Sequence, residues 1–209
     1  MAKILIACEE SQTVCKAFRA LCHEAYSCDI VPCSGGHPQW HIQGDVLEQL
    51  NKDWDLIIAH PPCTHLSSSG QWAFTKELKD PQLREDALRF VFKIYNSKCP
   101  RIVIENPIGV ISTRFRKPGQ IIHPWMFGDN ASKATCLWLK GLPKLVPSVV
   151  VKPQMEYHTW VDKKTSKTKR MEKWMYDIRT KPHKERSKLA SKTFDGIANA
   201  LAEQYGKLL

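Results

Sequence analysis

Short apolar runs alternate with amphipathic stretches along the first half of the chain. Apolar runs that stop abruptly at polar residues predict buried strands, and four of them do so, at residues 3–7, 25–28, 55–59 and 101–104. Residues 12–21 and 81–96 instead carry apolar side chains at helical spacing, with Ser11 and Pro81 as helix-start signals. Strands that alternate with helices predict an α/β fold, in which a mainly parallel sheet has helices on both faces.

Each predicted strand ends in polar or reactive side chains. Ligands of open α/β sheets bind outside the carboxyl ends of the strands, which meet at one edge of the sheet. We therefore expect a single site to be built from the segments at the ends of these strands, which are residues 8–11, Asp29, residues 60–64 and residues 105–107.

The second half of the chain has a different character. Residues 136–139 and 146–151 are β-like, and residues 191–206 predict a closing helix. Between them, residues 151–192 hold thirteen Lys and Arg against five Asp and Glu, which is most of the formal net charge of +10. Such an excess points to a polyanionic partner. We expect three parts: a catalytic core at 1–150, a basic and aromatic insert at 151–190, and the closing helix at 191–209.

One cysteine is placed for chemistry. Cys63 follows the strand at 55–59 in the stretch His60-Pro-Pro-Cys63, where two prolines restrict the backbone at the expected rim of the site. A thiolate is a strong nucleophile that can also leave again. Both properties suit methylation of a pyrimidine at carbon 5, because addition of the thiolate at carbon 6 makes carbon 5 nucleophilic. A buried structural cysteine is the alternative interpretation.

Glu105 ends the next strand along the chain, in the stretch Ile104-Glu-Asn-Pro107. Adjacent parallel strands would bring its carboxyl group near Cys63. A carboxyl group at that place can hydrogen-bond ring nitrogen 3 and the exocyclic amine of cytosine, which favours attack at carbon 6. The pair therefore predicts a site for a cytosine ring, whereas a strand-end Glu paired with a Lys is the alternative interpretation.

These motifs, in this order, resemble the catalytic core of DNA (cytosine-5) methyltransferases over residues 3–139. That family carries a Pro-Cys loop followed by Ser-x-Ser-Gly, here Pro62-Cys63 and Ser67–Gly70, and a Glu-Asn-Val motif, here Glu105-Asn-Pro. The chain resembles a small, phage-like member with a reduced target-recognition region. The resemblance implies a Rossmann-like methyltransferase fold that uses S-adenosylmethionine. The catalytic residues that it implies are Cys63, Glu105, Pro62 and Lys133.

The resemblance also implies where the cofactor would bind. Asp29 would hold the ribose, because a carboxylate accepts hydrogen bonds from both hydroxyls at once. Asp45, in the stretch Gly44-Asp-Val46, would contact the adenine amine, and Glu9 or Glu10 would bind the methionine ammonium group. The closing helix would pack back against the pocket. The implied cofactor-binding residues are Cys8, Glu9, Glu10, Ser11, Asp29, Ile30, Asp45, Val46, His60, Pro61 and Asn199.

Two of the family's motifs are altered in this chain. The glycine-rich first loop is replaced by Ala7–Ser11, which has no glycine to let the backbone approach a cofactor closely. The Gln-x-Arg-x-Arg motif falls on Ala131–Thr135, where only Lys133 keeps a positive charge and the bidentate grip of arginine is lost. Neither change touches Cys63 or Glu105.

The insert predicts a reduced element for DNA recognition. It mixes Lys and Arg with Tyr and Trp, which suits phosphate contacts together with base stacking on duplex or single-stranded DNA. A target cytosine in a duplex must leave the base stack to be methylated. A solvated hairpin without a ligand is the alternative interpretation. The residues expected to contact DNA are Ser69, Lys163, Lys164, Lys167, Lys169, Arg170, Trp174 and Arg179.

Two other functions stay open at this point: a methyltransferase for a free cytidine nucleotide, and a nucleic-acid-binding relative without catalysis. No G-x-G-x-x-G follows the first strand, which argues against a dinucleotide-dependent oxidoreductase. Cys28, Cys33, His37 and His41 fit no zinc-ligand spacing, so we expect no metal.

No apolar run approaches the roughly 20 residues that span a bilayer. We therefore expect no membrane contact and a cytoplasmic location, which would be the host cytoplasm if a phage encodes the chain. The sequence predicts no oligomeric state.

Overall fold

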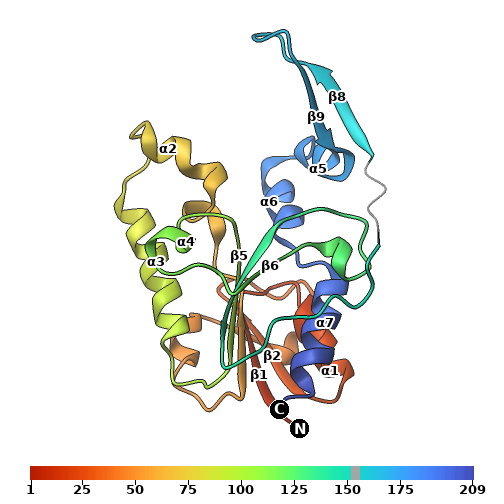
Figure 1. Cartoon of the computed structure of the whole chain (residues 1–209). Helices are drawn as coiled ribbons and strands as arrows, with labels where there is room; N and C mark the ends of the chain where they lie inside the picture. Colours follow the sequence, from red (N-terminus) through yellow and green to blue (C-terminus); the bar gives the residue numbers. More distant parts are fainter. Residues whose placement is uncertain (152–155) are drawn as a thin grey trace.

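A seven-stranded sheet forms the centre of the computed structural model, which describes residues 1–151 and 156–209 (Figure 1). Its strands lie in the order β3-β2-β1-β4-β5-β7-β6. β1 to β5 are parallel to one another, and β7 runs antiparallel to both β5 and β6. The mainly parallel sheet predicted from the sequence is confirmed. The strands are β1 (Lys3–Ala7), β2 (Glu24–Asp29), β3 (His41–Gln43), β4 (Leu56–Ala59), β5 (Ile102–Pro107), β6 (Gln120–Ile122) and β7 (Thr135–Lys140).

The register of β4 against β5 sets the geometry of the site. Ala59 pairs with Ile104, so His60 and Glu105 are the next residues along two neighbouring parallel strands. All of β4 and the first three residues of β5 are buried, because helices cover a parallel sheet on both faces. Polar side chains begin where these strands leave the core, at the edge where α/β sheets bind ligands.

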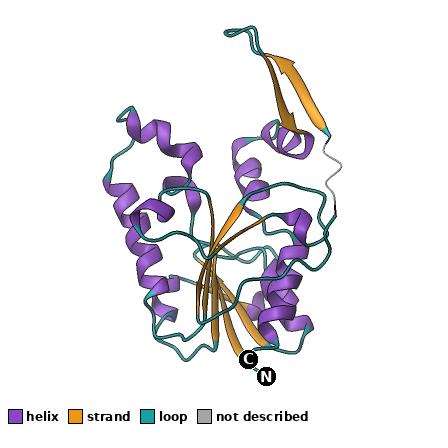
Figure 2. Ribbon diagram, viewed as in Figure 1, coloured by secondary structure: helices purple, strands orange, loops and turns teal. Residues whose placement is uncertain are grey.

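Helices cover both faces of the sheet (Figure 2). On one face α1 (Thr13–Ala20) and α7 (Asp195–Gly206) pack against each other and against β-strand side chains such as Ile58. On the other face α3 (Gln82–Tyr95) covers side chains such as Ile57. Alternate residues of one strand thus enter two separate apolar cores, as the period of a strand requires. The architecture is a Rossmann-like α/β fold, with a mainly parallel sheet and helices on both faces, as predicted.

Short helices connect these elements, and η3 among them places Cys63 directly beyond β4. Among the described residues, no helix combines the length and the apolar character needed to cross a membrane. The short helices are α2 (Gln71–Thr75), α4 (Ile111–Arg114), η1 (Pro38–Trp40), η2 (Val46–Gln49), η3 (Cys63–His65), η4 (Ser68–Gly70) and η5 (Pro124–Met126).

An arm, residues 156–191, projects from the core (Figure 1). It consists of the hairpin of β8 (Tyr157–Val161) and β9 (Thr168–Glu172), followed by α5 (Lys173–Arg179) and α6 (His183–Ser191). The hairpin turns at Asp162, whose carboxylate accepts hydrogen bonds from following backbone N–H groups, as Asp often does in turns. Residues 152–155, which belong to the predicted insert, lie outside the described residues.

Two expectations about local structure differ from the structure. Residues 146–151 form no strand, and Val149 makes only an isolated bridge to Phe127. The closing helix expected over residues 191–206 is present as α7, but it begins at Asp195, because Ser191 ends α6. Contacts with residues distant in sequence determine the secondary structure of these segments, and the local pattern of apolar residues contains no information about such contacts.

Gly196 marks a close contact between α7 and the loop after η5. A Cβ atom at Gly196 would lie 2.0 Å from the backbone oxygen of Phe127 and 2.6 Å from Asp129 Oδ2. We expect Gly196→Ala to lower the free energy of unfolding by about 1–3 kcal/mol, as overpacking does. Urea denaturation followed by tryptophan fluorescence measures this change. Gly44→Ala is the control, because its Cβ would meet nothing within 4 Å, and equal stability of both variants would contradict the close approach at Gly196.

Candidate active site

A pocket of about 580 Å³ lies at the carboxyl edge of the sheet, within the range usual for small-molecule sites. Residues 8–11 after β1, Asp29 at the end of β2 and His60 after β4 all line it. The end of the arm supplies a further wall through residues such as Leu189, and Lys192, directly after the arm, adds to it. The pocket is thus shared between the sheet edge and the arm.

Eight residues predicted from the sequence line this pocket, and five of the predicted cofactor residues do not. Among the five, Ile30 is 75% exposed, and Val46 and Pro61 are buried. Asp45 caps η2 by accepting a hydrogen bond from the Leu47 N–H at 2.9 Å, and Asn199 is exposed on α7. The eight that line the pocket are Cys8, Glu9, Glu10, Ser11, Asp29, His60, Pro62 and Cys63.

The first loop makes a glycine-like turn without glycine. Cys8 and Gln12 have φ values of 61° and 58°, in the left-handed region that glycine favours. Gln12 is fully buried, and its amide bonds to the Ser27 hydroxyl and to the backbone of His37. Sequence reasoning missed Gln12, and no local signal marks it. Its bonds hold residues 33–37 against the first loop, where a Cβ at Gly35 would lie 2.5 Å from the Ser11 oxygen.

Glu9 is a buried carboxyl group at the start of α1. Its two oxygens accept hydrogen bonds from the backbone N–H groups of Val14 at 2.7 Å and Cys15 at 3.1 Å. Burial raises the pKa of Glu9, while His60 and the two N–H groups act against that rise. Glu9 therefore satisfies the helix N-terminus as a capping side chain does, and it lies in the electrostatic reach of His60.

Cys63 lies in η3 on the pocket wall and is half-buried. Pro62 precedes it, is exposed and lines the pocket as well. Burial and the Glu105 carboxylate raise the pKa of the Cys63 thiol, whereas the nearby charge of Lys133 lowers it. The thiol, the carboxylate and the ammonium group therefore share one electrostatic environment.

His60 and Glu105 form an ion pair at the base of this site. His60 Nδ1 lies 3.1 Å from Glu105 Oε2, and the two side chains are only 11% and 15% exposed. Burial opposes charge on both groups, but their mutual hydrogen bond and attraction raise the pKa of His60 and lower that of Glu105. Both shifts favour a buried pair of imidazolium and carboxylate. His60, and not Glu105, is the member that lines the pocket.

Lys133 connects this centre to the arm. Its charge acts on His60, Cys63 and Glu105, and its Nζ donates a hydrogen bond to the backbone oxygen of Ala190 in α6 at 3.0 Å. The single positive charge left in the altered motif thus acts on His60, Cys63 and Glu105, and the hydrogen bond to Ala190 ties the end of the arm to the same place.

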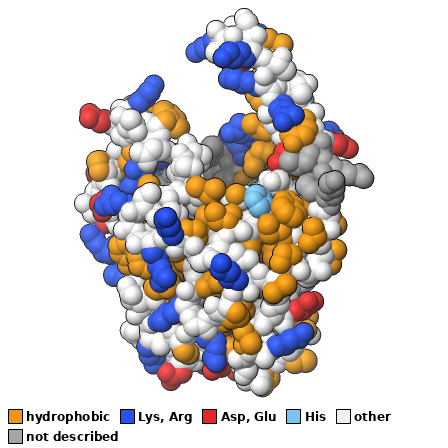
Figure 3. Space-filling model, viewed as in Figure 1, with side chains coloured by type: hydrophobic (Ala, Val, Ile, Leu, Met, Phe, Trp, Pro, Cys, Tyr) orange, Lys and Arg blue, Asp and Glu red, His pale blue; other side chains and the backbone are white. Residues whose placement is uncertain are grey.

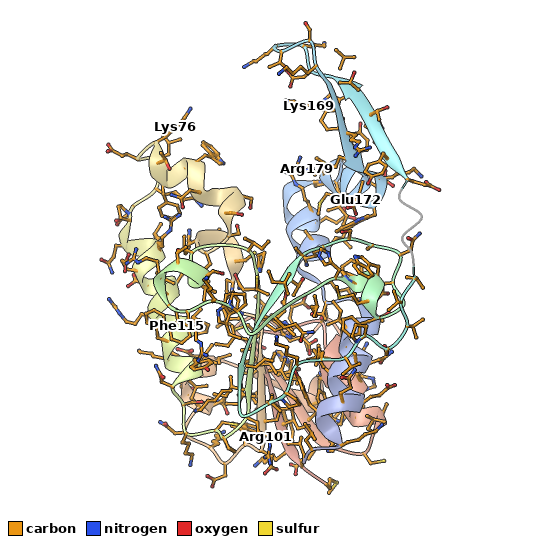
Figure 4. The ribbon with its side chains drawn as sticks, viewed as in Figure 1. Lys76, Arg101, Phe115, Lys169, Glu172 and Arg179 are labelled. Carbon is orange, nitrogen blue, oxygen red and sulfur yellow. The ribbon has the colours of Figure 1, made fainter. Side chains whose placement is uncertain are left out.

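The residues predicted to contact DNA lie mainly on the arm. Figure 3 shows Lys and Arg side chains on the arm, with an open hollow between the arm and the part of the core that carries α2. Figure 4 shows Lys169 and Arg179 on the arm and Lys76 across this hollow. Ser69 is also exposed, in η4 close to Cys63 in the chain. The basic residues of the arm that the sequence predicts to contact DNA are all exposed: Lys163, Lys164, Lys167, Lys169, Arg170 and Arg179.

Trp174 has a different position from these basic residues. It is half-buried, its indole N–H donates to Glu172, and its ring packs edge-on against Phe194 with centroids 5.7 Å apart. The Ser132 N–H donates to the same Glu172 carboxylate at 3.4 Å. Trp174 therefore lies at the junction between the arm and the core.

We also looked at the grouping of side chains that commonly bind metal ions. Within residues 1–151 and 156–209, no three or more His, Cys, Asp and Glu side chains are grouped so that they could hold a metal ion.

Comparison with known proteins adds a distant structural likeness. No protein-family model and no curated protein matches the sequence. Among solved structures, the chain is similar to an E. coli protein described as a "putative DNA modification methyltransferase encoded within prophage", with 12% identity and a TM-score of 0.45. The match covers 71% of this chain and 53% of the other, so the chain spans about half the length of that protein. So distant a likeness carries no argument about function, which must follow from the site itself.

Proposed function

We propose that this chain transfers a methyl group from S-adenosylmethionine to carbon 5 of cytosine in DNA, through a covalent adduct of Cys63. One observation carries the proposal: the Cys63 thiol lines a ligand-sized pocket together with His60, whose Nδ1 lies 3.1 Å from Glu105 Oε2. A nucleophile beside a proton donor is the combination that activates a pyrimidine ring. A fold kept for binding alone has no need of this combination.

The remaining walls of the pocket suit the cofactor. Asp29 presents a carboxylate that can accept hydrogen bonds from ribose hydroxyls. Glu10 offers a second carboxylate, positioned by a hydrogen bond from Ser34. Gly35 lies so close to the first loop that a larger residue would not fit there. This side of the pocket therefore has no side chain at residue 35. When bound, S-adenosylmethionine supplies an electrophilic methyl group.

The arm supports DNA as the substrate. Its exposed Lys and Arg side chains flank a hollow between the arm and the core (Figure 3). Neutralising phosphates with such side chains supplies most of the sequence-independent affinity for DNA. Because α6 ends at the pocket wall, a strand held by the arm would have its bases near Cys63.

A labelling assay tests the proposal. The protein is incubated with methyl-labelled S-adenosylmethionine and, in turn, with duplex DNA, single-stranded DNA and deoxycytidine monophosphate. Label in carbon 5 of cytosine in either DNA supports the proposal. Label in the mononucleotide alone would identify a nucleotide methyltransferase instead, and DNA binding without any label would identify a binding protein.

The arm is also open to a direct test. We expect replacement of Lys163, Lys164 and Lys167 by Gln to weaken DNA binding and to reduce the slope of log affinity against log salt by about one for each phosphate that is no longer neutralised. Fluorescence anisotropy over a salt series measures both quantities. Replacement of Lys93, Lys98 and Lys140 by Gln, on and near the far end of α3, is the control. A salt slope that is equal in both triple variants would remove the arm from the DNA interface.

A further inference from the structure

The two ring nitrogens of His60 have different surroundings. Nδ1 bonds to Glu105 Oε2 at 3.1 Å, whereas Nε2 is buried and has no hydrogen-bond partner among the described residues. Buried polar atoms in native proteins nearly always have a partner. Since His60 lines the pocket beside Cys63, an atom of a bound ligand is the natural partner for Nε2.

The charges around His60 determine what Nε2 can offer. Glu105 and Glu9 face the ring with carboxylates, and Lys133 faces it with an ammonium group. Burial lowers the pKa of His60, but the hydrogen bond and charge of Glu105, with Glu9, outweigh burial and Lys133 and raise it. An imidazolium carries hydrogen on both nitrogens, so a charged His60 has a proton on Nε2 to donate to a ligand in the pocket.

We infer that His60 is the catalytic acid of the proposed reaction: its Nε2–H protonates ring nitrogen 3 of cytosine, and Glu105 is a positioning residue that holds Nδ1. This inference rests on the proposed function and refines it, because the sequence alone predicts that Glu105 touches the ring itself. Glu105 and His60 would thus share the work as in other enzymes, where a carboxylate orients a histidine and stabilises its positive charge, and the histidine transfers the proton.

The step balances in atoms and electrons. The Cys63 thiol first loses its proton to water. The resulting thiolate forms a bond to carbon 6 while the π electrons of the ring move to nitrogen 3, which takes the proton from His60 Nε2. Carbon 5 is then part of an enamine and can take a proton from water. Loss of either proton at carbon 5, expulsion of the thiolate and return of the nitrogen 3 proton to His60 restore the aromatic ring. Cytosine therefore exchanges its carbon 5 hydrogen with water, and no methyl donor is needed.

This exchange provides an assay that is independent of the cofactor. DNA with tritium at carbon 5 of cytosine is incubated with the protein alone, and release of tritium into water is measured. We expect His60→Ala to lower the release by about 10²-fold or more. Added imidazole should restore part of it, because the vacated space adjoins the pocket. His60→Gln keeps an N–H donor without an acidic proton, so it should remain slow and should not respond to imidazole.

His65→Gln is the matched control, because His65 also has a buried ring nitrogen without a partner among the described residues but does not line the pocket. It should release tritium at the wild-type rate. Release by His60→Ala at the wild-type rate, or a slow His60→Ala that imidazole does not rescue, would overturn the assignment of His60. No release by the wild-type protein would instead overturn the proposed function, and with it this inference.

Discussion

Cys63→Ser should abolish methyl transfer to cytosine, with a loss of roughly 10⁴–10⁶-fold, as removal of a catalytic nucleophile does. A serine hydroxyl ionises far less readily than a thiol, and its oxygen is a poorer leaving group from carbon 6. The side chain at residue 63 lines the pocket, so the replacement changes one atom at the pocket wall and little else. The labelled-methyl assay measures the rate.

A trapping experiment adds a second readout for Cys63. Cytosine with fluorine at carbon 5 has no proton to lose after methylation, so the adduct of the wild-type protein should persist and be visible by mass spectrometry. Cys63→Ser should form none. Cys22→Ser is the control, since Cys22 is a free and exposed thiol that does not line the pocket. An adduct on Cys63→Ser, or its normal turnover, would exclude Cys63 as the nucleophile.

Glu105→Gln should slow methyl transfer by about 10²-fold or more, and it should do so while making Cys63 more reactive. The glutamine oxygen can still accept a hydrogen bond from His60 Nδ1, but the charge that holds the imidazolium is gone. The Glu105 carboxylate also raises the pKa of the Cys63 thiol, although less than burial does. Its removal therefore lowers that pKa and increases the thiolate fraction at any pH below it.

The two effects of Glu105→Gln, on methyl transfer and on the reactivity of the Cys63 thiol, have opposite signs. Alkylation of Cys63 by iodoacetamide, followed by peptide mass spectrometry over a range of pH, should be faster than in the wild type. Lys133→Met provides the matched reverse case, because Lys133 lowers the pKa of Cys63 and its removal should slow alkylation. Slower alkylation of Glu105→Gln would show that the carboxylate and the thiol do not share the environment described above.

The core strands were predictable because burial on both faces leaves a continuous apolar run in the sequence. β1 matches its prediction residue for residue, and β4 begins one residue later than predicted. The same reasoning identified the ends of the strands as the site edge, so the segments around Cys63 and Glu105 could be located without coordinates. The hairpin of β8 and β9 left no such run, since its residues are half-buried or exposed.

The detailed contacts of the site could not be predicted from the sequence. His60 and Glu105 are 45 residues apart, and only the register of β4 and β5 makes them neighbours. Asp45 was expected to bind the cofactor, but its carboxylate caps η2. The contribution of Leu189 and Lys192 to the pocket depends on the path of the arm. The role of such a side chain depends on residues far away in the sequence, so the residues next to it give no pattern from which the role could be inferred.

α6 belongs to the arm by chain order and to the pocket by contact, and the bond from Lys133 to Ala190 joins the two. A long polymer bound to the hairpin and a small molecule bound in the pocket would therefore both contact α6. If binding of one ligand orders α6, it strengthens binding of the other. Thermodynamic linkage then requires the two affinities to change by an identical factor.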